Sequence, residues 1–221
     1  MKENKSVHII CILDRSGSMG KLQKQVISNF NSFLGEQQSQ KGKAFLTLVL
    51  FDNKYEVVHN RVNIDDVKPI DENTYRIQGG THMYDAIGTA INSCNDKNTL
   101  VLIQTDGKTL GDKKFSKEQI MKMIGEKENI GWDFLFLGAN IDTGEEGSKM
   151  GLRNKSISFQ ANDIGISDAY MGMGEKAKHY RHMKGQDDNY IPPKDSDLSK
   201  KNKNKGAKVK YDSKTDSFIL A

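Results

Sequence analysis

The chain has 221 residues, with 33 Lys and Arg against 29 Asp and Glu, so its formal net charge is only +4. This length suits one α/β domain with an appendage, and it exceeds that of a mini-protein that needs metals or disulfides to fold. So small a net charge does not by itself indicate a nucleic-acid or membrane binder. The two cysteines, Cys11 and Cys94, form no disulfide framework, and we interpret them as buried free thiols of a reducing compartment.

Short apolar runs alternate with helical patterns through the first half of the chain. The β-branched run at 8–13 predicts a first strand, and apolar residues at helical spacing over 21–34 predict a helix after it. The run at 44–51 predicts a second strand, and 55–58 predicts a short third strand at an edge. Residues 83–94 again show the apolar spacing of a helix face.

The second half continues this alternation. Strands are predicted at 99–104, 132–137 and 156–159, and a closing helix is predicted over 166–180. Ser116 and Gln119 form a capping-box pattern at the start of another helix. Several strands are almost continuously apolar, which is typical of strands buried on both faces. The chain therefore predicts a doubly wound, mostly parallel α/β sheet with helices on both faces.

The composition changes near Lys184. Beyond it lie two of the three prolines and a lysine run between 200 and 210. We expect residues 1–184 to form the domain and 185–221 to be a lysine-rich extension. That extension is expected to be largely flexible or to form a small hairpin from 207–211 and 217–220.

No segment has the pattern of a membrane span or an export signal. The apolar run at 7–13 is interrupted by His8 and ends in Asp14 and Arg15. A spanning helix needs ~20 apolar residues, and a signal peptide needs a small-residue cleavage site after its apolar core. We therefore expect a soluble, cytoplasmic protein with no membrane partner.

Three loops at strand or helix ends carry hard oxygen donors and no His or Cys ligand. In open α/β sheets, ligands bind beyond the carboxyl ends of the strands, so these loops are expected to meet there. Two carboxylates with three hydroxyls suit Mg²⁺ or Mn²⁺, because few anionic ligands leave the ion electrophilic. The donors are Asp14, Ser16, Ser18, Thr81 and Asp106.

The pattern Asp14-x-Ser16-x-Ser18, then Gly-Gly-Thr81, then Thr-Asp106-Gly resembles the metal-ion-dependent adhesion site of von Willebrand factor type A (vWA) domains. The resemblance covers roughly residues 5–182, and residues 132–142 further resemble small bacterial and phage vWA proteins. It implies a Rossmann-like sheet in the order 3-2-1-4-5-6, with one short antiparallel edge strand.

The same resemblance implies how the metal is held. Ser16, Ser18 and Thr81 would bind it directly, and Asp14 and Asp106 directly or through water. A carboxylate from an Asp or Glu of a protein partner would complete the coordination, so that partner binding depends on the metal. Mg²⁺ is the expected ion, with Mn²⁺ or Ca²⁺ as alternatives.

A rim of residues beside the ligands is expected to contact the partner. Met19 and Tyr84 would form an apolar collar there, although Tyr84 could instead pack under its helix. Lys108 stands where many vWA relatives have an acidic residue, and a cation at this position would weaken metal binding or attract an acidic partner. The complete predicted rim is Arg15, Met19, His82, Tyr84 and Lys108.

The sequence favours a protein-interaction module and not an enzyme, because the nucleophile-elbow and phosphate-loop motifs are absent. A less favoured alternative is a metal-dependent hydrolase with His82 as general base. Another is association with nucleic acid through the basic end of the last helix and the tail. His179 and His182 at i, i+3 are interpreted as part of a solvated helix end and not as zinc ligands.

Overall fold

A six-stranded sheet in the order β3-β2-β1-β4-β5-β6 forms the centre of the computed structural model, which describes residues 6–106, 109–139, 150–152, 155–185, 209–212 and 217–220. Only β3 runs antiparallel to its neighbour, and every other pair in this sheet is parallel. The predicted fold class and strand order are therefore confirmed. The strands are β1 (Val7–Asp14), β2 (Ala44–Phe51), β3 (Tyr55–Asn63), β4 (Thr99–Thr105), β5 (Asp133–Ala139) and β6 (Ser156–Phe159).

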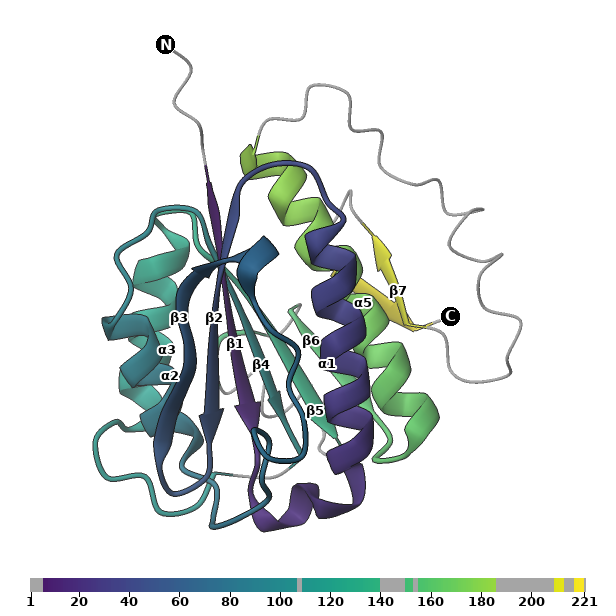
Figure 1. Cartoon of the computed structure of the whole chain (residues 1–221). Coiled ribbons are helices and arrows are strands. Elements are labelled where there is room, and N and C mark those ends of the chain that lie inside the picture. Colours follow the sequence, from purple (N-terminus) through teal and green to yellow (C-terminus); the bar gives the residue numbers. More distant parts are fainter. Residues whose placement is uncertain are drawn as a thin grey trace.

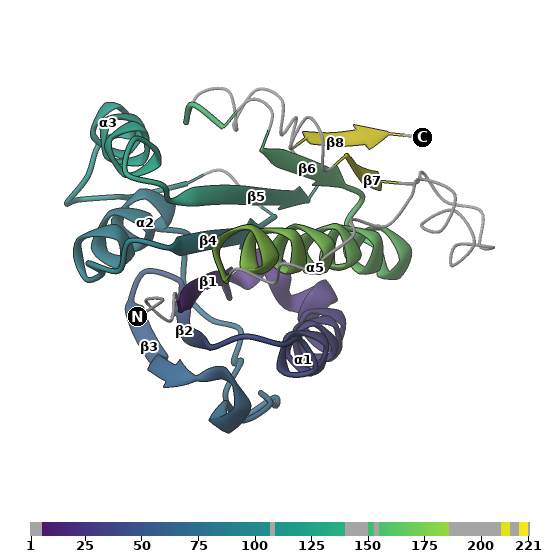
Figure 2. The same ribbon diagram turned by 90° about the horizontal axis from the view of Figure 1, so that it is seen from above.

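Helices cover both faces of the sheet, as the views in Figure 1 and Figure 2 show. On one face lie α2 (Met83–Asn92) and α3 (Lys117–Glu128). On the other lie α1 (Gln23–Gln38) and α5 (Asp163–Gly185), which pack against each other. Helices on both faces of the sheet are the arrangement that the alternation of strands and helices in the sequence predicts.

The central strand β1 shows why the core strands are so apolar. All eight of its residues are buried. Because successive side chains of a strand point to opposite faces, Ile9 packs in the core beneath α1 and α5, while Ile10 packs in the core beneath α2 and α3. Cys11 and Cys94 are both buried and free, as expected.

Several elements differ in length from their sequence predictions, and α5 extends beyond the predicted 166–180 at both ends. The edge strand β3 extends to Asn63 instead of ending near Val58, because polar residues on a half-exposed strand hide the β pattern. The first helix is preceded by a 3₁₀ segment, η1 (Gly17–Leu22), and its α-helical part runs from Gln23 to Gln38. The capping box of Ser116 and Gln119 is present at the start of α3, as predicted.

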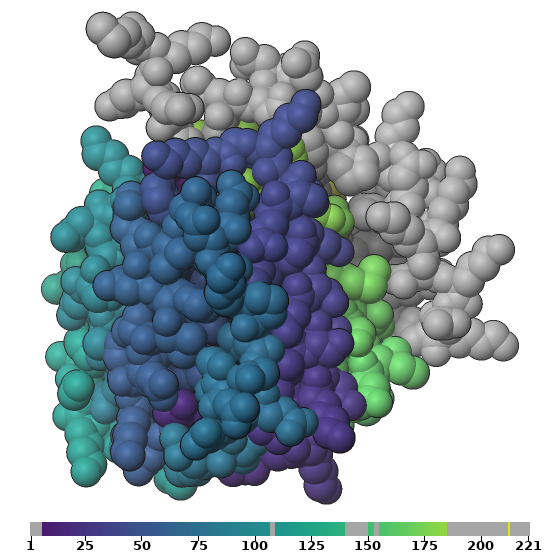
Figure 3. Space-filling view, in the orientation of Figure 1, coloured from purple at the N-terminus to yellow at the C-terminus, as the bar shows by residue number. Residues whose placement is uncertain are grey.

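The segment after β3 crosses the edge of the sheet and closes one side of the molecule. It begins with η2 (Ile64–Asp66), and Figure 3 shows it in blue between the α1 side and the teal α2–α3 side. Ile70 and Tyr75 bury their side chains in the core. The Asn31 side chain donates to the Ile70 carbonyl and accepts from the Ile70 N–H, both at 2.9 Å. This anchoring brings residues 79–81 toward the carboxyl end of β1.

Beyond α5, two short strands pair with each other outside the main sheet. β7 (Val209–Asp212) and β8 (Ser217–Leu220) are antiparallel, with Asp212 opposite Ser217. These strands overlap the segments 207–211 and 217–220, for which the sequence predicted a small hairpin. Within the described residues, no helix combines the length and the apolar character that crossing a bilayer requires.

Candidate metal centre

Asp14 lies at the carboxyl end of the central strand β1 and is fully buried. One carboxylate oxygen, Oδ1, accepts a hydrogen bond from the backbone N–H of Ser16 at 2.7 Å. The other, Oδ2, accepts one from the Thr105 hydroxyl at 2.6 Å. These two contacts fix the carboxylate from its own loop and from the neighbouring strand β4, so its orientation does not depend on a bound ion.

The serines and Asp106 form a connected set of oxygens above Asp14. The Ser18 hydroxyl donates to Asp106 Oδ1 at 2.7 Å, and the Ser16 and Ser18 hydroxyl oxygens are 3.2 Å apart. Ser16 is buried, Asp106 is half-buried and Ser18 is exposed. The set therefore runs from the interior to an open edge, where a partner could approach.

The second loop joins this set through its backbone. The Gly79 carbonyl accepts a hydrogen bond from Gly17 N–H at 3.2 Å. Gly79 has a φ of +69°, and a Cβ there would lie 2.4 Å from Asn53 Oδ1, so only glycine fits this position without strain. Thr81 is buried two residues later and directly precedes His82, the N-cap residue of α2.

Residues that the motif did not include hold the first two loops together. The Tyr75 hydroxyl donates to the Asp14 carbonyl, and Gln78 N–H donates to the Arg15 carbonyl at 2.9 Å. Asp52 accepts from Arg15 Nε at 2.8 Å through its side chain and from His82 N–H at 2.9 Å through its carbonyl. No sequence pattern indicated Tyr75 or Asp52, because each acts on a residue distant in sequence.

A further set of missed residues supports the start of α2 from outside. No side chain caps this helix at its own N-cap residue, His82. Instead Thr109 Oγ1 accepts from Met83 N–H at 3.0 Å, and Asp112 Oδ1 accepts from Asp85 N–H at 2.9 Å. The loop that follows the third motif therefore positions the helix that follows the second.

The charges of this site fit a divalent cation. Burial raises the pKa of Asp14 to about 6, although hydrogen bonds from Thr105 and Ser16 act in the opposite direction. Burial also raises the pKa of Asp106, against the hydrogen bond from Ser18. Within the described part of the chain, no Lys, Arg or His forms an ion pair with either carboxylate. A bound dication would supply the positive charge that the two carboxylates lack.

The predicted rim residues do not all lie at the surface. Arg15 is 3% exposed and forms ion pairs with Asp52 at 2.8 Å and Glu56 at 2.6 Å. Met19 is also fully buried, with its sulfur 3.8 Å from Gln104 Nε2. Both side chains lie beneath the loop, so Met19 does not form the exposed collar predicted for it.

The other rim residues have mixed placements. His82 is half-buried at the start of α2, and Tyr84 is half-buried and packs against the core beneath α2 and α3. Tyr84 therefore follows the alternative in which it packs under its helix. Lys108 lies outside the described residues.

The basic side chains of α5 are largely committed to internal contacts. Lys176 is 1% exposed and pairs with Asp133 at 2.5 Å, and Lys178 pairs with Glu175 at 2.9 Å. Arg181 is buried and donates to carbonyls in the turn between α1 and β2, including that of Gly42 at 2.9 Å. This helix therefore does not present a free cationic face, while the lysine run at 200–205 lies outside the described residues.

No family model and no curated protein matches the chain, but solved structures do. The ArnB paralog VWA2 from Sulfolobus acidocaldarius is 19% identical, covers 77% of this chain and 44% of its own, and gives a TM-score of 0.53. The vWF domain of the type V pili tip protein Mfa5 from Porphyromonas gingivalis is 12% identical, with coverages of 80% and 96% and a TM-score of 0.58. The chain has the vWA fold.

A third similar structure is that of proximal thread matrix protein 1 from the mussel byssus, in which zinc occupies the metal-ion-dependent adhesion site (MIDAS) motif. It is 14% identical, with coverages of 78% and 48% and a TM-score of 0.57. The chain spans less than half the length of the vWA2 paralog and of the mussel protein. At these identities the similarity concerns the fold, and the use of the site has to be argued from its own residues.

Proposed function

We propose that this chain is a metal-dependent protein-interaction module whose divalent cation binds a carboxylate of a partner protein. The observation that carries the proposal is the convergence of Asp14, Ser16, Ser18 and Asp106 at an open edge of the sheet, without a cationic side chain among the described residues to pair with the two carboxylates. Thr81 adds a third hydroxyl from the second loop. The similar vWA structures support the same use of the site.

The donor set explains why a bound ion would remain electrophilic. Two carboxylates neutralise a dication, and the three hydroxyls from Ser16, Ser18 and Thr81 are neutral ligands. An incoming carboxylate therefore gains a strong charge interaction that a site with more anionic ligands would not offer. Mg²⁺ is the proposed ion, with Mn²⁺ or Ca²⁺ as alternatives, because all the donors are hard oxygens.

This role needs no catalytic group from the chain, and it does not depend on a basic surface. We propose His82, half-buried at the start of α2, and Lys108 as the remaining rim residues that meet the partner. Association with nucleic acid is not favoured, because Lys176 and Arg181 are buried in internal contacts.

The first test is metal binding by the full chain. Titration with Mg²⁺ and Mn²⁺, followed by calorimetry and by the shift in melting temperature, should show one site that Asp14→Ala abolishes. Asp66→Ala is the matched control, because Asp66 is exposed in η2 and distant from the loops. Equal binding by both variants would contradict the proposed site.

The second test addresses the partner. Capture from lysate is carried out with Mg²⁺, with EDTA, and with Asp14→Ala in Mg²⁺. Proteins retained only by the wild-type chain in Mg²⁺ are the expected result. Retention of the same proteins under all three conditions would contradict metal-dependent partner binding, even if the chain binds the metal.

A further inference from the structure

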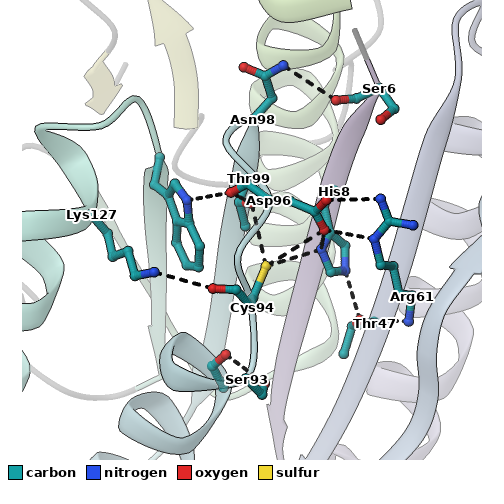
Figure 4. A network of polar contacts seen from close by, with 12 residues as sticks. Ser6, His8, Thr47, Arg61, Ser93, Cys94, Asp96, Asn98, Thr99 and Lys127 are labelled. Atoms are coloured by element: carbon teal, nitrogen blue, oxygen red, sulfur yellow. Dashed lines mark hydrogen bonds and ion pairs between the residues drawn. The ribbon is translucent and has the colours of Figure 1, made fainter. Parts of the chain in front are cut away.

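A second cluster of metal-ligating side chains lies at the opposite end of the sheet from the candidate metal centre. His8 is near the start of β1, while Cys94 and Asp96 lie between α2 and β4 (Figure 4). Asp14 is six residues further along β1, which places the two clusters ~20 Å apart at the rise of an extended strand. The cluster therefore belongs to a separate part of the molecule, and its function does not depend on the proposed interaction site.

The three potential ligand atoms converge on one point. His8 Nδ1 lies 2.8 Å from Asp96 Oδ2 and 3.4 Å from Cys94 Sγ, and Sγ lies 3.9 Å from Oδ2. All three lie within 4.8 Å of one another. Ligand atoms around a tetrahedral zinc ion are about 3.3–3.8 Å apart, given zinc–ligand distances near 2.0–2.3 Å. Small side-chain shifts would therefore open the triangle enough to admit the ion.

The arrangement does not fit a nucleophilic relay. In a Cys-His-Asp relay the imidazole uses one nitrogen for the nucleophile and the other for the carboxylate. Here both the thiol and the carboxylate face Nδ1, and Nε2 is 2.8 Å from Thr47 Oγ1. Convergence of sulfur, nitrogen and oxygen on a single point is the geometry of metal ligation.

A surrounding shell of contacts holds these ligands in place. Thr47 Oγ1 can accept from His8 Nε2–H when Nδ1 binds a metal, and can donate to Nε2 when Nδ1 carries a proton. Arg61 donates to both oxygens of Asp96, with Nε to Oδ2 at 2.8 Å and Nη2 to Oδ1 at 2.9 Å. The Trp132 indole N–H donates to the Asp96 carbonyl at 2.8 Å. Shells of this kind orient zinc ligands.

The cluster reaches solvent through the partly exposed Asp96, while His8 and Cys94 are buried. It lines a pocket of about 410 Å³ between the amino half of β1, the edge strand β3 and the segment after α2. Arg61, on the wall of this pocket, has a φ of +49°, a conformation that residues other than glycine rarely adopt. Its N–H donates to Thr47 Oγ1 at 2.9 Å, next to a register shift between β2 and β3. The strained backbone thus aims its guanidinium at Asp96.

We propose that His8 Nδ1, Cys94 Sγ and Asp96 Oδ2 bind a zinc ion, with the fourth coordination position open to the pocket. Binding releases the thiol proton of Cys94 to solvent. His8 stays neutral, because its single proton moves from Nδ1 to Nε2, where Thr47 Oγ1 accepts it. The thiolate and the carboxylate then balance the charge of the ion. A nitrogen, a sulfur and an oxygen donor favour zinc over the hard cation of the oxygen site.

The experiment uses the full chain in a non-thiol reductant, with Co²⁺ as a spectroscopic probe and Zn²⁺ as its competitor. The wild-type protein should show a thiolate-to-cobalt charge-transfer band, and one equivalent of Zn²⁺ should remove it. Cys94→Ala should abolish this band, and Asp96→Asn should weaken Zn²⁺ binding at least tenfold. Cys11→Ala is the matched control, because Cys11 is the other buried free thiol and lies in the opposite core.

Two outcomes would overturn the proposal. One is the absence of a charge-transfer band in the wild-type protein, and the other is unchanged Zn²⁺ affinity in both Cys94→Ala and Asp96→Asn. Asp14→Ala distinguishes the two metal sites, since it should leave the cobalt band intact. Circular dichroism of each variant checks that a lost band reflects lost ligands and not an unfolded chain.

Discussion

At the scale of single residues, the proposed metal ligand Asp14 destabilises the folded protein when no metal is bound. Its carboxylate is fully buried, and its pKa is raised to about 6 chiefly by burial. Without a metal, the ionised form at neutral pH is therefore less stable in the folded protein than in the unfolded chain. A bound dication would reverse this penalty, so the residue suits metal binding better than it suits the metal-free fold.

Replacing Asp14 with asparagine should separate these two effects. In EDTA at pH 7, we expect Asp14→Asn to raise the free energy of unfolding by about 1–3 kcal/mol, because a shift of one pKa unit corresponds to about 1.36 kcal/mol. Urea denaturation measures this change. The same variant should lose the stabilisation that Mg²⁺ gives the wild-type protein.

The pH dependence of this difference has a defined sign. The folded pKa of Asp14 is higher than its unfolded value, so the penalty is complete above about pH 6 and disappears below about pH 4. The advantage of Asp14→Asn in EDTA should therefore shrink as the pH falls from 7 to 4. An advantage that is constant with pH would assign the effect to something other than ionisation.

Gly79 offers a test of the second loop. Because its φ is positive and a Cβ would lie 3.1 Å from Asp52 Oδ1 and closer still to Asn53, we expect Gly79→Ala to destabilise the protein by about 1–3 kcal/mol. It should also weaken Mg²⁺ binding. The control is Gly35→Ala within α1, where a Cβ meets no atom and should stabilise by about 0.5–1 kcal/mol. Thermal unfolding with and without Mg²⁺ distinguishes the two.

At the scale of elements, α2 and the segment before α3 stabilise each other. Asp112 caps the start of α2, and the Asp85 carboxylate in turn accepts from the backbone N–H groups of Lys113, Lys114 and Phe115 at 2.8–3.0 Å. Burial alone would raise the pKa of Asp85, but these hydrogen bonds outweigh it and the pKa lies below its usual value. The ionised carboxylate therefore stabilises the folded state.

Asp85→Asn should show the opposite pH dependence to Asp14→Asn. We expect it to lower the free energy of unfolding by about 1 kcal/mol at pH 7, because an amide oxygen accepts more weakly than a carboxylate. The wild-type advantage is present above the ordinary carboxyl range near pH 4 and is lost as the pH falls through the depressed folded pKa. Urea denaturation at pH 7 and pH 3 measures it, and a deficit as large at pH 3 as at pH 7 would contradict this account.

At the scale of the whole molecule, α5 is fastened to the far half of the sheet by a buried ion pair. Lys176 and Lys155 both contact the Asp133 carboxylate at the start of β5, at 2.5 and 2.9 Å. The Tyr180 hydroxyl adds a hydrogen bond to the Gly131 carbonyl at 2.9 Å. The basic sequence of α5 therefore serves packing in part, because its Lys176 holds the helix against the start of β5.

Breaking this pair should be costly. We expect Lys176→Met to lower the free energy of unfolding by about 1–3 kcal/mol, because among the described residues Asp133 then keeps only the partly exposed Lys155 as a cationic partner. Lys178→Ala is the control, because its partners Glu175 and Glu36 lie nearer the surface and the change should stay below about 1 kcal/mol. Similar losses in both variants would mean that burial of Lys176 does not matter.

Local patterns predicted most of the fold. The continuous apolar runs at β1, β2, β4 and β5 mark strands buried on both faces, and the capping box marks α3, because each depends on residues close in sequence. β3 was predicted too short, since a half-exposed edge strand tolerates the polar residues that hide its period. The first site loop was recognisable because its three donors, Asp14, Ser16 and Ser18, lie within five consecutive residues.

The sequence by itself determined the alternation of strands and helices and the oxygen donors that follow the strands, since strand periodicity and loop motifs are properties of adjacent residues. The order of the strands followed from the resemblance to vWA domains. Only the tertiary structure decided which side chains face one another across long separations. It buried Arg15 against Asp52 and brought His8 to Cys94, 86 positions away. Such pairings depend on how strands and loops cross in space, and no local pattern encodes them. The candidate zinc site therefore became visible only in the folded chain.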